Sequence, residues 1–279
     1  MNSEFDVELI DIAPTIANIL KITMPEPTGK INSALSNYAQ KNKVKKVIVV
    51  IVDSLGYSLY NHLEHNMPTL SCLASKGFFY KCKSPATTTT PSIASILTGY
   101  YPSEHQINFT KDIIIERKKT LSSLKTKSIL EWGHQSGIAS SLIIEAEGAK
   151  AMEGLIDNAI GIPDSKDILE FDAMTKKLSI KEILRGTTLI VLHLRSIDRY
   201  AHRSNTWIDI IKAGKSIDTN VHDLLKHLDS NTLIFICGDH TIHSAEKWLI
   251  NATENEKTSH IQNNVALIVC STDEFLNKG

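Results

Sequence analysis

The sequence lacks paired cysteines and long apolar segments. Its four cysteines are scattered and form no Cys-x-x-Cys pair, which argues against a disulfide framework. Cys237 and Cys270 end apolar runs, where a buried free thiol is the plainer interpretation. No segment approaches the ~20 apolar residues that span a bilayer, and the N-terminus is acidic rather than basic and then apolar. These absences predict a cytoplasmic protein without a membrane segment.

Net charge is also nearly absent. The 279 residues carry a formal charge of −1, so the chain has no global basic footprint for nucleic acid or an anionic membrane. The 42% of hydrophobic residues are enough for a sizeable core, and no fixed-period repeat or convincing linker divides the chain. We therefore expect one α/β domain over residues 1–279, with a small cap-like insertion around 108–180.

Five apolar runs rich in β-branched residues lie along the chain. They are continuous rather than alternating, which is typical of strands covered on both faces of a parallel sheet. Segments with helical spacing separate them, and this alternation predicts a doubly wound, mostly parallel sheet with helices on both faces. The runs are Lys46–Asp53, Gly137–Glu145, Thr188–Leu194, Thr232–Cys237 and Asn264–Cys270.

Side chains that can bind metal recur near the ends of these runs, where doubly wound folds place their sites. Each has a plainer explanation when taken alone. An aspartate after a strand often caps a turn, an Asp–His pair spaced by four is often a surface ion pair, and a histidine in a loop is often only solvated. Together they form a set of oxygen and nitrogen donors without a thiolate, which suits zinc, manganese or iron. The set is Asp53, Asp198, His202, Asp239, His240 and His260.

A run of four threonines, residues 87–90, stands directly before Pro91. A proline at this place suits the first turn of a helix, so a hydroxyl of the run would lie near a helix N-terminus. Free N–H groups there can hold a phosphoryl oxygen. Two metal ions about 3.5–4 Å apart can stabilise the attacking and leaving oxygens of an in-line phosphoryl displacement. A threonine hydroxyl of this run would then be the nucleophile of such a two-metal site.

The order of these motifs resembles the alkaline phosphatase superfamily, and within it the nucleotide pyrophosphatase/phosphodiesterase branch. The motifs are an aspartate at a strand end, Thr-x-Pro with "LTGYYPSEH", Asp-x-x-x-His, Asp-His and a late histidine, and they span about three-quarters of the chain. The resemblance selects Thr89 as a nucleophile that forms a phospho-threonine, and it implies two divalent ions, zinc first, with manganese or iron compatible. It assigns Asp53, Thr89, Asp239 and His240 to one ion, and Asp198, His202 and His260 to the other.

Some positions depart from the family pattern. Sulfatases share the pattern "PSxASxLTG", which this chain has as "PSIASILTG", but they need a modifiable cysteine or serine as nucleophile, and usually an arginine where this chain has Ile93. The phosphodiesterase branch commonly has asparagine where this chain has Ser92. We expect the N–H of Thr90, with the Ser92 hydroxyl as a weaker candidate, to hold a phosphoryl oxygen. His105 and His243 lie near the motifs and are interpreted as structural.

The chain order also differs from that of the resembled family. Residues 9–30, which begin near "DIAPT", look like a segment that follows the last histidine and its strand in those relatives. The chain ends soon after "NVALIVC", where the relatives would continue into that segment. This order predicts a circular permutation, with the "DIAPT" helix packed beside the late-histidine region.

The expected function is a two-metal hydrolase of phosphate esters that acts on a small phosphorylated substrate, of which a nucleotide is one example. A phosphonate hydrolase with the same site stays open, as does a mutase or phosphoryl-transfer enzyme. A metal-binding pseudoenzyme without catalysis is the alternative outside the enzymes. The sequence does not predict the exact substrate, the preference for monoester or diester, or the oligomeric state.

Overall fold

The computed structural model describes residues 7–117, 123–204, 206–249 and 251–276. Within these residues, eight strands form one sheet in the order β1-β3-β8-β7-β2-β6-β4-β5. Every pairing is parallel except those of β8, which is antiparallel to both β3 and β7. The strands are β1 (Val7–Glu8), β2 (Lys46–Val52), β3 (Phe78–Lys83), β4 (Ser140–Glu145), β5 (Asn158–Ile162), β6 (Leu189–Leu194), β7 (Thr232–Gly238) and β8 (Asn264–Ser271).

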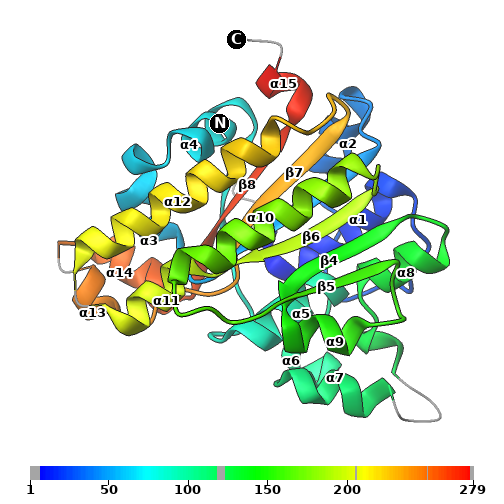
Figure 1. Ribbon diagram of the computed structural model, residues 1–279, viewed down its shortest axis with the longest axis horizontal. Coiled ribbons are helices and arrows are strands. Elements are labelled where there is room, and N and C mark those ends of the chain that lie inside the picture. Colours follow the sequence, from blue (N-terminus) through cyan, green and yellow to red (C-terminus); the bar gives the residue numbers. More distant parts are fainter. Residues whose placement is uncertain (1–6, 118–122, 205, 250, 277–279) are drawn as a thin grey trace.

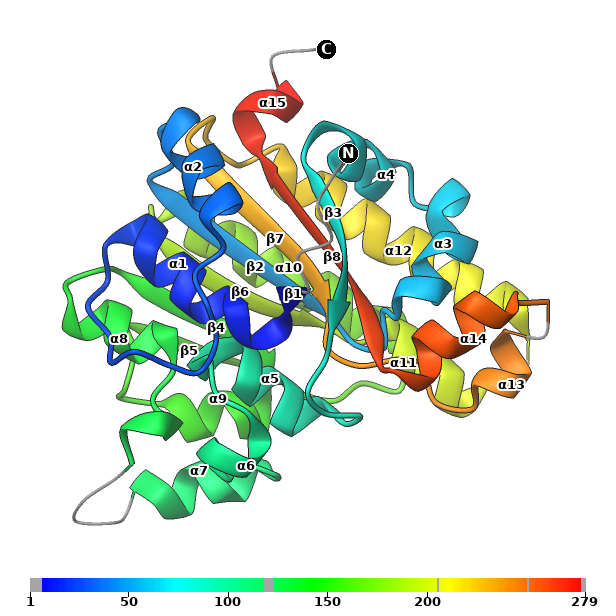
Figure 2. The ribbon, with the colours of Figure 1, turned by 180° about the vertical axis from the view of Figure 1, so that it is seen from behind.

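Helices cover both faces of this sheet (Figures 1 and 2). On one face lie α1 (Ile12–Leu20), α2 (Ser33–Lys41), α5 (Thr89–Thr98), α8 (Ile129–Gln135) and α9 (Ala146–Met152). On the other lie α3 (Tyr57–Leu63), α4 (Pro68–Lys76), α10 (Ile168–Leu184), α11 (Ser196–Arg203) and α12 (Trp207–Leu225). The remaining helices are α6 (Pro102–His105), α7 (Thr110–Arg117), α13 (Ala245–Trp248), α14 (Glu254–Ile261) and α15 (Thr272–Leu276), with short 3-10 turns at Leu9–Asp11, Glu64–Asn66 and Leu124–Thr126.

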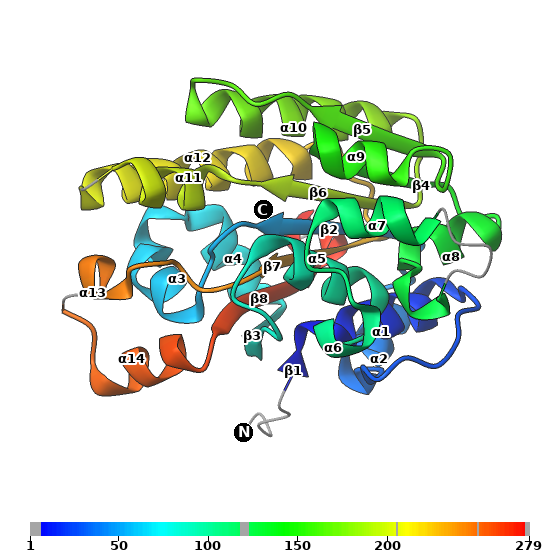
Figure 3. The ribbon, with the colours of Figure 1, turned by 90° about the horizontal axis from the view of Figure 1, so that it is seen from below.

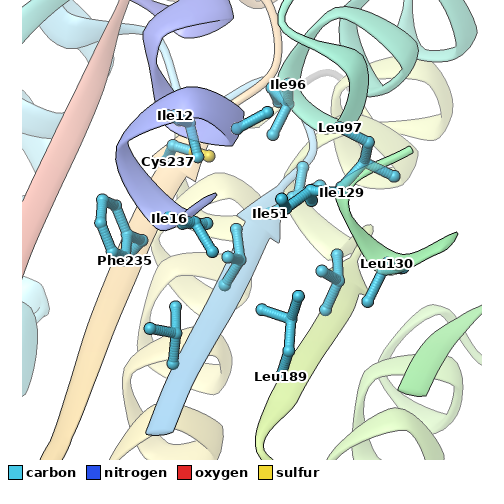
Figure 4. Close-up of a cluster of buried hydrophobic side chains, with 14 of the residues drawn as sticks. Ile12, Ile16, Ile51, Ile96, Leu97, Ile129, Leu130, Leu189, Phe235 and Cys237 are labelled. Carbon is cyan, nitrogen blue, oxygen red and sulfur yellow. The ribbon is translucent and has the colours of Figure 1, made fainter. Parts of the chain in front are cut away.

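Two cores explain why the apolar runs are continuous. Successive side chains of a strand point to opposite faces, so Ile51 of β2 joins the core under α1 while Val52 joins the core under α12. Figure 4 shows the first core, where Ile12 and Ile16 of α1 lie over Ile51 and Phe235. Both layers are apolar, which confirms the predicted doubly wound α/β fold.

The predicted strands are found, with two corrections. β8 is antiparallel, whereas the prediction had placed its apolar run among parallel strands. A continuous apolar run indicates burial on both faces and says nothing of direction. β5 was missed because its sequence "NAIGI" is short and half-buried, and it lies between the helices α9 and α10.

The segment 108–180 is largely part of the central fold. It contributes β4 and β5 to the sheet, and α10 packs against β6. Of its helices, α7 does not belong to either core layer, and it packs against α9. The portion outside the layers is therefore smaller than the predicted cap-like insertion.

The N-terminal segment reaches the edge of the sheet but not the late-histidine helix. β1 pairs with β3, so that Val7 lies opposite Cys82. α1 packs against α2, α5, α8 and β2, whereas α14, which carries His260, packs against α3 and β8 (Figure 2). The expectation that the "DIAPT" helix lies beside the late histidine is therefore wrong, because its apolar face covers β2 and β7 instead. The permuted order itself stays a prediction.

All four cysteines are free, as predicted, and three of them are buried. Burial raises the pKa of Cys82 and Cys237 well above the ordinary thiol value, so both thiols stay protonated at neutral pH. In the described part of the chain, no helix combines the length and the apolar character that crossing a bilayer requires.

Candidate active site

The centre of the sheet gathers the predicted ligands. β2 lies between β6 and β7 and is parallel to both, so the three carboxyl ends meet at one edge. Asp53 and Asp239 directly follow β2 and β7, whose last residues Val52 and Gly238 pair with each other. Asp198 stands in the first turn of α11, just after β6, and α5 and α11 both approach the end of β2 (Figure 3). Strand ends thus bring together residues that are far apart in the sequence.

Two aspartates and three histidines supply two overlapping groups of ligand atoms. Asp53, Asp198 and His240 each offer one atom within 4.8 Å of the others. Asp198 and His202 form a second group with His243, under the same distance limit. Because the two groups share Asp198, the arrangement suits two neighbouring ions.

His243 was interpreted from the sequence as structural. Its ring lies 5.5 Å from that of His202 and 4.9 Å from that of His240, measured between centroids. It stands three residues after His240 in the loop that follows β7. That position after a strand end was the available signal, and it makes His243 a candidate ligand.

Sequence reasoning also missed His193 and Glu145. His193 lies inside β6 and is only 1% exposed. Its Nε2 is 3.5 Å from Asp53 Oδ2, and its Nδ1 is 3.6 Å from Glu145 Oε2. With Asp53 and Asp239 it forms a third, fully buried group of ligand atoms. The signal was a single polar residue within a continuous apolar strand, because burial of such a residue requires a partner.

Thr89 lies beside the candidate ligand cluster, at the start of α5. Thr88 caps the helix with extended backbone (φ −137°, ψ 153°). The Oγ1 of Thr89 is 3.4 Å from His240 Nε2. The first N–H groups of a helix have no partner within it, so the first turn of α5 presents donors suited to an anionic oxygen next to this hydroxyl.

Ser92 serves the loop before α5. Its side chain is fully buried, and its hydroxyl donates to the carbonyl of Ala86 at 3.1 Å. The Ser84 hydroxyl, 3.4 Å from that of Ser92, donates to the Asp239 carbonyl. The predicted contact between the Ser92 hydroxyl and a substrate is therefore not supported, because this hydroxyl is already engaged and turned into the protein.

Asn263 joins the loop of Thr89 to the loop of His240. Its Oδ1 accepts the Thr241 N–H at 3.0 Å, and its Nδ2 donates to the Ala86 carbonyl at 2.5 Å. Both loops are thus tied to the turn before β8. This bridge fixes the hydroxyl of Thr89 relative to the His240 ring.

Among the predicted aspartate and histidine ligands, His260 is the one that none of the three groups of the described residues includes. It lies in the last turn of α14, three residues before Asn263. The other six predicted residues are brought together. His105, interpreted as structural, is buried with its Nε2 3.0 Å from Ser95 Oγ, and burial lowers its pKa to about 4, so it is neutral.

The buried carboxylates of the site are stabilised by nearby positive charge. Burial raises the pKa of Asp53, but His193 and His240 outweigh it and hold that pKa well below its usual range. Burial and the charge of Asp53 raise the pKa of Asp239 to about 6. Burial lowers the pKa of His240, yet Asp239 and Asp53 raise it to about 10. Ligand atoms of Asp53 and Asp239 lie within 4.8 Å of each other, and two buried negative charges so close together are destabilising unless a cation compensates them.

Unsatisfied oxygens point to the same conclusion. Asp53 Oδ1 and Asp239 Oδ2 are buried and accept no well-aligned hydrogen bond from the described residues, and the nearest cationic group, His240 Nε2, lies 3.2 Å from the first and 3.6 Å from the second. Buried carboxylate oxygens are normally paired or bound to metal. The residues present therefore fit divalent ions of the kind that oxygen and nitrogen donors prefer, namely zinc, manganese or iron.

Gly238 allows the loop after β2 to approach closely. A Cβ added there would lie 2.2 Å from the carbonyl oxygen of Leu55, two residues beyond Asp53. We expect Gly238→Ala to displace this loop, to lower the free energy of unfolding by roughly 1–3 kcal/mol and to weaken metal binding. Gly214→Ala is the matched control, because its Cβ would meet side chains only at 3.5 Å or more, and it should be neutral or stabilising. Denaturant unfolding of both variants measures this, and equal stabilities would contradict it.

Comparison with known families agrees with this geometry. Residues 45–161 match the sulfatase family, and residues 120–278 match the metalloenzyme superfamily. Since the second match covers more than half of the chain, the chain belongs to the metalloenzyme superfamily, and its place in the alkaline phosphatase superfamily is confirmed. It is a metal-dependent hydrolase of that superfamily. The nucleotide pyrophosphatase/phosphodiesterase branch stays a prediction.

Solved structures share the fold at low sequence identity. The PH0037 protein of Pyrococcus horikoshii is 15% identical, with a TM-score of 0.55 over 82% of this chain and 86% of that one. Phosphonoacetate hydrolase of Sinorhizobium meliloti 1021, bound to phosphonoformate, is 13% identical, with a TM-score of 0.53 over 71% of this chain and 56% of that one. The lipoteichoic acid synthase LtaP of Listeria monocytogenes is 11% identical, with a TM-score of 0.57 over 92% and 71%. The chain thus spans little more than half of the phosphonoacetate hydrolase. No curated protein sequence matches it.

Proposed function

We propose that the protein is a two-metal hydrolase of phosphate esters in which Thr89 is the nucleophile. The observation that carries this proposal is the hydroxyl of Thr89 at a helix N-terminus, 3.4 Å from His240 Nε2. It lies beside carboxylates that are buried and unsatisfied. The proposed nucleophile, the N–H groups that can bind an anion and the candidate metal ligands therefore lie next to one another.

The ligands divide between two ions. Asp53, Asp239 and His240 would hold the ion nearer to Thr89. Asp198 and His202 would hold the other, with His260, as the resemblance implies, or His243, as the geometry suggests, completing it. Bound ions would lower the pKa of the Thr89 hydroxyl and neutralise charge on the phosphoryl oxygens.

The residues of this chain then carry out the displacement. The Thr89 hydroxyl loses its proton to solvent and its oxygen attacks phosphorus, so that a new P–O bond forms. The bond to the leaving oxygen breaks on the opposite side, and that oxygen takes up a proton from solvent to leave as the alcohol. The N–H of Thr90 in the first turn of α5 holds one phosphoryl oxygen. Water then attacks phosphorus in the phospho-threonine, the P–O bond to Thr89 breaks, and the proton that the water gives up restores the Thr89 hydroxyl.

A sulfate ester is the second candidate, because residues 45–161 match the sulfatase family. Thr89 is the argument against it, since sulfatases modify a cysteine or serine at this position. A phosphonate hydrolase keeps the threonine and the metals, and the fold is shared with a phosphonoacetate hydrolase. A pseudoenzyme would have had no need to keep so complete a set of ligands.

One panel of substrates tests these alternatives. Protein loaded with zinc or manganese is given nitrophenyl phosphate, bis-nitrophenyl phosphate, nitrophenyl sulfate and phosphonoacetate. We expect the phosphate esters to be hydrolysed, with loss of turnover in chelator and recovery when the metal is restored. Turnover of the sulfate or the phosphonate alone would replace the proposed function, and no turnover with bound metal would favour the pseudoenzyme.

A further inference from the structure

A narrow pocket runs along α5 from the proposed nucleophile. One face of the helix forms its wall, with residues that recur at helical spacing. At 1.5 Å per residue, this wall extends about 13 Å from Thr89 to Thr98. Its members are Thr89, Thr90, Ile93, Ala94, Leu97 and Thr98.

The facing walls are mostly apolar. Leu142 and Ile144 line the pocket from the same face of β4, and Met152 lines it from α9. Ile107 and Ile113 close another side, the latter from α7. Figures 2 and 3 show α5, α7 and α9 gathered at this end of β4.

Three of the polar side chains that line the pocket, Thr126, Ser128 and Glu131, are already engaged. The Glu131 carboxylate accepts the Ser128 N–H at 2.8 Å and its hydroxyl at 2.9 Å. The hydroxyl of Thr126 donates to the Ser123 carbonyl at 2.7 Å. A ligand entering the pocket therefore meets mainly hydrocarbon, and an apolar group is the one that gains from burial there.

The pocket and the metal site share residues. Thr89 belongs to both, and Glu145, which lies 3.6 Å from His193, also lines the pocket. The cavity has a volume of about 60 Å³. This is less than half of the ~150 Å³ cavity that accommodates benzene in an engineered protein, so the space suits a slender chain rather than an aromatic ring or a nucleobase.

We propose that this pocket takes a short, unbranched alkyl chain attached to the phosphoryl group at Thr89. The inference rests on the proposed function for the position of that group. In an in-line displacement the leaving oxygen departs opposite to the nucleophile, so a chain lying along α5 is the substituent that stays on phosphorus. The substrate class is therefore a phosphodiester with a small aliphatic alcohol on the retained side.

Binding of alkylphosphonic acids tests the pocket without requiring turnover. Calorimetry on the metal-loaded protein compares methyl-, propyl-, butyl- and hexylphosphonic acid. We expect the affinity to rise about fourfold for each added methylene until the chain fills the cavity. A dissociation constant that is equal across the series, or no binding of any member, would overturn the pocket.

Matched variants assign the effect to this place. Ala94→Leu fills the pocket from the α5 wall and should flatten the dependence on chain length. Ala34→Leu makes the same change at an exposed position of α2 and should keep the dependence of the unmodified protein. Metal content checks that both variants fold. If Ala94→Leu does not fold, the binding series with the unmodified protein still tests the pocket. Flattening in both variants would contradict the assignment.

Turnover separates this inference from the proposed function. Alkyl nitrophenyl phosphodiesters of the same chain lengths should show the same rise in kcat/KM, since nitrophenolate leaves and the alkyl group stays on phosphorus. A flat binding series in a protein that hydrolyses these esters would overturn the pocket alone. A rising binding series in a protein that hydrolyses no ester would support the pocket and remove the proposed function.

Discussion

Replacement of Thr89 by alanine is expected to lower kcat for phosphate esters by roughly 10³-fold or more while the metal content stays unchanged. The variant loses the oxygen that attacks phosphorus, but it keeps the carboxylates and imidazoles that hold the ions. Thr89→Ser keeps a hydroxyl and should keep part of the activity. Initial rates and metal analysis on the same samples measure both effects.

Thr87→Ala is the matched control for this substitution. Thr87 is exposed, belongs to the same threonine run and precedes α5, so its loss should change kcat by no more than a few-fold. Full activity of Thr89→Ala would refute the assignment of the nucleophile. Loss of metal together with activity would show that Thr89 is chiefly a ligand.

Asp239→Asn should separate the electrostatic cost of the site from its binding of metal. The amide oxygen still accepts the N–H groups of Ser54 and His240, which now reach Asp239 Oδ1 at 3.0 and 2.9 Å. The substitution removes the negative charge of Asp239, which lies close to Asp53. Burial and the charge of Asp53 raise the pKa of the Asp239 carboxyl group to about 6. In chelator, the variant should therefore be at least as stable as the unmodified protein at neutral pH.

The order of stabilities should reverse when metal is added. Unmodified protein gains about 2.7 kcal/mol when free metal is 100-fold above its dissociation constant, whereas Asp239→Asn should gain little and lose turnover. Thermal unfolding with and without zinc measures this. Asp229→Asn, an exposed carboxylate paired with Lys46 before β7, should respond to metal as the unmodified protein does. A normal metal response of Asp239→Asn would contradict its role as a ligand.

Much of the site could be predicted because its residues follow strands. Asp53, Asp198 and Asp239 stand after apolar runs, and in a parallel sheet those ends meet whatever the length of chain between them. His193 was missed because its chemistry depends on Asp53 and Glu145, which come from neighbouring strands. His243 was set aside because loop geometry, which the sequence does not reveal, decides whether it reaches Asp198.

The positions of the strands could be predicted from local sequence patterns, whereas the direction of β8 could not. The runs that became β2, β6 and β7 are continuous because each strand is buried on both faces. The direction of β8 could not be predicted, because it depends on the connection through α13 and α14 rather than on composition. The Ser92 hydroxyl was expected to contact the substrate, but it donates to the Ala86 carbonyl instead. Tertiary contacts, which the sequence does not reveal, determine this orientation.

Acid-quenched protein, taken during turnover of a phosphate ester, reveals whether Thr89 becomes phosphorylated. Peptide mass spectrometry then locates any phosphoryl group that has become covalently attached. We expect a phosphoryl group on Thr89 that appears only with metal and substrate and is absent from Thr89→Ala. A phosphoryl group on another residue, or none at Thr89 in samples that accumulate the intermediate under slowed hydrolysis, would contradict it.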